Sequence, residues 1–70
     1  MTLPSDISHD RVVRALQRAG FSITEGAKHT LAKKNGVRTT IPRHTRIVRV
    51  LLARIVRQAG MTPGEFSRLL

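Results

Sequence analysis

The sequence predicts a small α+β protein in which helices flank a three-stranded antiparallel sheet, in the order α-β-β-β-α. Apolar residues recur at helical spacing near both ends of the chain, and Gly20 and Gly60 close these stretches. Between them, Asn35-Gly36 separates two strand-like runs. We expect one domain over residues 1–70, with a thin core because a chain of this size buries little of its surface.

The first helix is predicted over residues 9–19. Ser8 is a suitable N-cap, and Asp10 lies in the first turn, where a negative charge faces the positive end of the helix dipole. Apolar residues then follow at helical spacing, from Val12 to Ala19. His9 lies in the same first turn, and we expect it to be exposed and without a specific role.

Three strands are predicted over residues 21–24, 28–34 and 37–41, the last two joined by the turn Asn35-Gly36. A two-residue turn fixes the register, which places three pairs opposite one another: Lys34 and Val37, Ala32 and Thr39, Thr30 and Ile41. The face with Ala32, Val37 and Ile41 should pack against the helices. The other face should be open, and it carries His29, Leu31, Lys33, Arg38 and Thr40. Leu31 fits this arrangement poorly, because an apolar side chain is left exposed.

The C-terminal part of the chain is predicted to be helical. Pro42 ends the sheet, and Thr45 is a suitable N-cap for a long helix over residues 46–59. The apolar residues of this segment cover about half of its circumference, whereas Val50 falls among the arginines of the other side. Proline and glutamate after Thr62 predict a capped short helix over residues 64–70.

The charge of the chain is its strongest compositional signal. Thirteen Lys and Arg residues against four Asp and Glu residues give a net charge of +9. Such a protein attracts polyanions, and a basic domain of this kind favours nucleic acid over an acidic protein as the partner, although both fit the charge.

Several classes of function are excluded by what the sequence lacks. There is no cysteine, which excludes disulfides and thiol nucleophiles, and the three histidines are not spaced as zinc ligands, so we expect no metal and no cofactor. No apolar run approaches the roughly 20 residues of a membrane span. The N-terminal residues lack the pattern of a signal peptide, so we expect a cytoplasmic protein.

His29 is the residue best suited to chemistry. Imidazole exchanges protons near neutral pH, as metal-free RNA cleavage requires, and cations must offset the charge that develops on the phosphate. Basic residues around His29 are the candidate phosphate ligands: Lys28, Lys33, Lys34, Arg38 and Arg43. His44 is a potential accessory group, with a structural role as its alternative. From these residues alone, a catalytic and an incidental His29 are equally compatible with the pattern.

An ordered set of short motifs resembles one protein family. In sequence order these are Leu3-Pro4-Ser5, Val13-x-x-Leu16, Ala19-Gly20-Phe21, Gly26-x-x-His29, Ile41-Pro42-Arg43-His44 and Gln58-Ala59-Gly60. The set is similar to that of the HicA-type mRNA interferase toxins, small proteins of the double-stranded RNA-binding fold. The α-β-β-β-α order has the outline of the same fold.

This resemblance implies a toxin of a type II toxin–antitoxin system that cleaves mRNA as an endoribonuclease and is blocked by a HicB-type antitoxin. It also implies that His29 is the catalytic histidine. Ala27 departs from the family, which usually has serine there, and this change leaves the histidine itself untouched. Two other functions stay open: a non-catalytic RNA-binding module, and a basic protein that holds an acidic partner.

Overall fold

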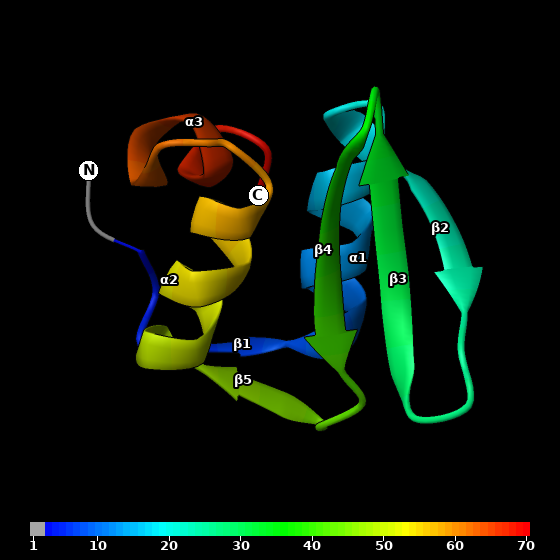
Figure 1. The fold of residues 1–70 in the computed structure, drawn as a ribbon. Coiled ribbons are helices and arrows are strands. Elements are labelled where there is room, and N and C mark those ends of the chain that lie inside the picture. Colours follow the sequence, from blue (N-terminus) through cyan, green and yellow to red (C-terminus); the bar gives the residue numbers. More distant parts are fainter. Residues whose placement is uncertain (1–2) are drawn as a thin grey trace.

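The computed structural model describes residues 3–70 (Figure 1). Its elements are β1 (Asp6–Ser8), α1 (His9–Arg18), β2 (Ser22–Glu25), β3 (His29–Lys34), β4 (Val37–Pro42), β5 (Arg46–Val48), α2 (Arg49–Gln58) and α3 (Pro63–Ser67). Strands β2, β3 and β4 form an antiparallel sheet, and β1 and β5 form a separate pair. The predicted α+β class and three-stranded sheet are confirmed. The predicted domain also includes Met1 and Thr2, which lie outside the described residues.

Helix α1 begins at the predicted serine cap. The Ser8 hydroxyl accepts a hydrogen bond from the Arg11 N–H at 3.3 Å, which satisfies one of the unpaired donors of the first turn. The helix ends before Gly20, whose φ of +98° lies in the left-handed region that glycine adopts readily. The prediction for this helix therefore agrees with the structure to within one residue at each end.

The β3–β4 hairpin has the register that the sequence predicted. Asn35 and Gly36 have φ angles of +48° and +82°, as a type I′ turn requires. The three predicted pairs, which include Ala32 with Thr39, are all present. On the inner face the side chains that meet the helices are fully buried or nearly so: Thr30, Ala32, Thr39 and Ile41. At the tip, Val37 stays 37% exposed. Leu31, predicted to be exposed, is half-buried.

Strands β1 and β5 were not predicted, and the segment 46–48 was wrongly assigned to the long helix. Ile7 lies opposite Ile47, and both are buried. Thr45 is therefore not the N-cap of α2, which begins at Arg49 after Val48 and has no side-chain cap. The Arg49 N–H instead donates to the Ser5 carbonyl at 3.2 Å. A short apolar run suits a strand as well as a helix, and only the distant β1 decides between them.

Helix α3 is closed at its start by a capping box, as predicted. The Thr62 hydroxyl accepts from the Glu65 N–H, and the Glu65 carboxylate accepts from the Thr62 N–H. These hydrogen bonds from Thr62 hold the pKa of Glu65 below its ordinary value. The helix begins one residue earlier than predicted and ends at Ser67. Its Phe66 is fully buried.

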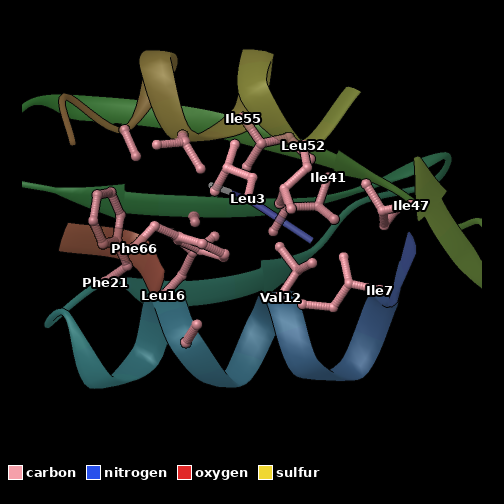
Figure 2. Packing of buried hydrophobic residues seen from close by; sticks show 14 residues of the cluster. Leu3, Ile7, Val12, Leu16, Phe21, Ile41, Ile47, Leu52, Ile55 and Phe66 are labelled. Carbon is pink, nitrogen blue, oxygen red and sulfur yellow. The ribbon is translucent and has the colours of Figure 1, made fainter. Parts of the chain in front are cut away.

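The core lies between the inner face of the sheet and the helices. Figure 2 shows Val12 and Leu16 of α1 facing Leu52 and Ile55 of α2 across a common apolar cluster. At one end of the view it is closed by Ile7 and Ile47, and toward the other lie Phe21 and Phe66. Both phenylalanines are buried. In Figure 1 the helices lie away from one face of the β2–β3–β4 sheet, which stays uncovered.

We expect Leu52→Ala to lower the free energy of unfolding by about 2–5 kcal/mol, because Leu52 is fully buried and its loss leaves a cavity. Val50→Ala is the matched control in the same helix, where the side chain is 80% exposed and the change should stay within about 0.5 kcal/mol. Urea denaturation followed by circular dichroism measures both. Equal losses in the two variants would contradict the core described here.

Candidate functional site

The uncovered side of the sheet, here called the open face, is the candidate functional surface. Side chains alternate along each strand, so the register assigns residues of all three strands to it. The open face consists of Ser22 and Thr24 of β2, His29, Leu31 and Lys33 of β3, and Arg38, Thr40 and Pro42 of β4. All of these residues are exposed except Leu31 and Pro42, which are half-buried. A surface of this kind admits a long ligand rather than enclosing a small one.

His29 is the first residue of β3 and lies at one end of the open face. It pairs with Pro42 of β4, and its side chain is exposed, as the register predicted. Its carbonyl accepts a hydrogen bond from the Gly26 N–H at 2.8 Å. The exposed Lys28 precedes it directly. His29 thus combines an accessible imidazole with a main chain that is held in place.

Lys33 and Arg38 lie at the other end of the open face. Lys33 of β3 and Arg38 of β4 are directly opposite one another. Lys33 is four residues from His29 along β3, a separation of about 13 Å at the rise of an extended strand. The sequence suggested one cluster of cations around His29, and the structure separates this pair from it along the same face. Like charges placed opposite one another in a sheet are destabilising. The pair concentrates positive charge at this end of the open face.

The other predicted cations make contacts within the protein. Lys34 is on the inner face, where its Nζ donates to the Ala19 carbonyl at 2.5 Å and lies 5.8 Å from the centre of the Phe21 ring. Arg43 follows β4, and its Nη2 donates to the Glu25 carboxylate at 2.9 Å and to the Gly26 carbonyl. Neither side chain belongs to the open face.

A depression beside the start of α1, here called the α1 cleft, has a volume of about 370 Å³. It is lined by Ser8, His9, Asp10, Glu25, Arg43, His44 and Thr45. His44 therefore shares this cleft with His9. The expectation that His9 is merely exposed is wrong, because its side chain is 20% exposed and its Nε2 lies 3.0 Å from the Thr30 hydroxyl. One signal was available in the sequence: Thr30 points inward in the predicted register, and a buried hydroxyl needs a partner.

Two further structural observations bear on the candidate site. Within residues 3–70, no group of three or more His, Asp or Glu side chains is arranged to hold a metal ion. In the same part of the chain, no helix has the length and apolar character needed to cross a bilayer.

Comparison with known proteins identifies the family. The sequence model of the family described as "HicA toxin of bacterial toxin-antitoxin" matches residues 10–61, which extend from α1 beyond the end of α2 and include the whole three-stranded sheet. No curated protein and no solved structure gives a significant match. The family match covers well over half of the chain and agrees with the resemblance seen in its motifs. A toxin of such a system is paired with an antitoxin. The chain therefore belongs to the HicA family, the toxins of bacterial toxin–antitoxin systems.

Proposed function

We propose that this toxin is a metal-independent endoribonuclease that cleaves mRNA with His29 as general acid or base. The observation that carries the proposal is the position of His29, exposed at the first residue of β3 on the open face of the sheet. A proton-transferring group must reach the reacting atoms of a polymer, and an uncovered face allows this. Membership of a toxin family and the net charge of +9 support the same activity.

The proposed reaction needs no cofactor. The 2′-oxygen of one ribose attacks the adjacent phosphorus, a new P–O2′ bond forms, and the P–O5′ bond breaks. A base takes the proton of the 2′-hydroxyl, and an acid gives a proton to the departing 5′-oxygen, which leaves a 2′,3′-cyclic phosphate and a 5′-hydroxyl. An imidazole with an ordinary pKa of about 6.5 can serve in either step. His44, two residues beyond the Pro42 that pairs with His29, is the candidate accessory group.

Lys28, beside His29, and the two cations of the open face have separate tasks in this proposal. Lys28 is adjacent to His29 and offsets the charge that develops on the reacting phosphate. Lys33 and Arg38, about 13 Å farther along the strand, bind phosphates of the same RNA. The RNA would therefore run along the β3–β4 hairpin. Lys34 and Arg43 contribute to the general positive field.

A non-catalytic RNA-binding module is the second candidate. The observation that favours it is that His29 is the only histidine among the residues of the open face, whereas the proposed reaction transfers two protons.

The open face also suits an acidic partner protein, and we propose that a HicB-type antitoxin covers it and thereby blocks access to His29.

We expect His29→Ala to lower the rate of RNA cleavage by at least about 100-fold while RNA binding is retained, because general acid–base catalysis contributes a factor of this size or more. The measurement is cleavage of a long RNA in EDTA at low salt. The wild type and Thr24→Ala, an exposed residue of the same face, are purified identically as controls. Equal cleavage by His29→Ala would refute the catalytic role, and binding without cleavage by any variant would leave the RNA-binding module.

The double variant Lys33→Gln/Arg38→Gln should bind RNA more weakly and with a smaller salt dependence. Loss of two phosphate contacts should reduce the slope of log affinity against log salt by about 1.4, since each contact on a single strand contributes about 0.7. Arg54→Gln/Arg57→Gln is the control, because it removes the same charge from exposed positions of α2, on the other side of the sheet. Equal slopes for the two double variants would argue against binding along the hairpin.

We expect Arg38→Glu to raise the free energy of unfolding by about 0.2–1 kcal/mol, because it replaces a like-charge pair with Lys33 by an opposite-charge pair. The same substitution should weaken RNA binding. Urea denaturation at low salt measures the gain, which should shrink at high salt as charges are screened. A loss of stability at low salt would show that the two cations do not repel one another in the folded protein.

A further inference from the structure

The turn between β2 and β3, formed by residues 26–28, determines where the main chain of His29 lies. It is closed by the hydrogen bond from the Gly26 N–H to the His29 carbonyl at 2.8 Å. A Cβ at position 26 would lie 2.7 Å from the same carbonyl oxygen, closer than such atoms approach. Glycine is therefore required here by a close approach of two main-chain segments, and the position of His29 depends on the shape of this turn.

Arg43, in the segment that follows β4, also holds the turn in place. Its Nη2 donates both to the Gly26 carbonyl and to the Glu25 carboxylate, the latter at 2.9 Å. The Gly26 peptide group and its neighbours are thus held at two points, by the His29 carbonyl on one side and by the Arg43 guanidinium on the other. Glu25 is at the end of β2, Gly26 is in the turn, and Arg43 is in the segment after β4.

Glu25 is held in turn by a buried partner. The Thr30 hydroxyl lies 3.3 Å from both oxygens of the Glu25 carboxylate, and Thr30 is fully buried. A carboxylate only accepts hydrogen bonds, so the single hydroxyl proton of Thr30 is donated to Glu25. The His9 Nε2 lies 3.0 Å from the same hydroxyl and donates to Thr30 in the tautomer that carries the ring proton on Nε2. A chain of hydrogen bonds thereby runs from α1 through Thr30 and Glu25 to Arg43.

The ion pair with Glu25 helps to decide whether Arg43 binds phosphate or holds the turn in place. If Arg43 served only to bind phosphate, a carboxylate on its guanidinium would compete with the RNA and repel it. An exposed ion pair also contributes little to folding stability, and both side chains are substantially exposed. A carboxylate in this place is accounted for if its task is to orient Arg43 on the Gly26 carbonyl.

We propose that Glu25 and Arg43 are positioning residues that fix the turn of residues 26–28 and, through it, the placement of His29. The inference rests on the proposed function, because it concerns the placement of the catalytic group. Small displacements of a catalytic group lower the rate of the chemical step strongly while leaving substrate binding intact. Neither Glu25 nor Arg43 touches the reacting atoms in this proposal.

The first experiment compares Glu25→Gln with Asp10→Asn. Both remove one carboxylate that lines the α1 cleft, but Asp10 contacts the His9 Nδ1 at 3.5 Å, whereas Glu25 contacts Arg43 and adjoins the turn. With RNA as substrate, Glu25→Gln should lower kcat by about 10- to 100-fold, while KM stays equal or falls because a negative charge is lost. Asp10→Asn should leave kcat unchanged. A Glu25→Gln variant with unchanged kcat and lower KM would overturn the proposal, since Glu25 would then act only through its charge.

Arg43→Lys and Gly26→Ala test the same turn from its other sides. Arg43→Lys keeps the positive charge, so a phosphate-binding role predicts a small change, mainly in KM. Positioning predicts a fall in kcat, because the planar guanidinium fixes the directions of the two N–H groups of Nη2, whereas the ammonium of lysine rotates on a flexible stem. Gly26→Ala should also lower kcat, since its Cβ would displace the His29 carbonyl. If Arg43→Lys raised KM alone, Arg43 would be a phosphate ligand and not a positioning residue.

Amide hydrogen exchange gives a readout that does not depend on cleavage. The Gly26 N–H should exchange at least about 10-fold faster in Glu25→Gln and Arg43→Lys than in Asp10→Asn, while amides of α1 and α2 keep their wild-type protection. Unchanged exchange at Gly26 would overturn the proposal. If His29→Ala cleaves RNA normally, the catalytic role of His29 is refuted. Hydrogen exchange at Gly26 would still show whether Glu25 and Arg43 hold the turn in place.

Discussion

The two-residue turn at Asn35-Gly36 is the constraint on which the rest of the structure depends. Its positive φ angles fix which residues of β3 and β4 face one another. Because side chains alternate with a period of two, this one register sends Ala32 and Ile41 into the core and His29 to the opposite surface. A slip by one residue would bury the imidazole and expose the core at the same time. Folding stability and the candidate site are therefore selected by the same local geometry.

Features encoded locally were predictable from the sequence, and features that depend on distant partners were not. The Ser8 cap, the hairpin register and the Thr62–Glu65 capping box each involve residues within a few positions of one another, and all are present. The segment 46–48 was misassigned because its strand partner is β1, at the other end of the chain. Its apolar pattern alone is compatible with both a strand and a helical turn.

The candidate site divides in the same way. The exposure of His29 and the face shared by Lys33 and Arg38 follow from the register, so the sequence sufficed for them. The contacts of Arg43 did not follow, because they depend on the path of the chain after Pro42 and on Glu25 at the end of another strand. His9 was missed for a related reason: its partner Thr30 is close to it only after α1 packs on the sheet.

The β1–β5 pair has a consequence for the order of folding. Ile7 and Ile47 meet although they are forty positions apart in sequence, so pairing them must close a long loop before any contact compensates the entropy. The hairpin and α1 can form from short segments, whereas this ladder cannot form on a ribosome until the chain has been synthesised beyond Val48. The His9 N–H donates to the Thr45 carbonyl beside the ladder, at 3.3 Å. The start of α1 and the segment after β4 can therefore reach their final places only after Val48 has been synthesised, whereas all residues of the β3–β4 hairpin are present in the chain before then.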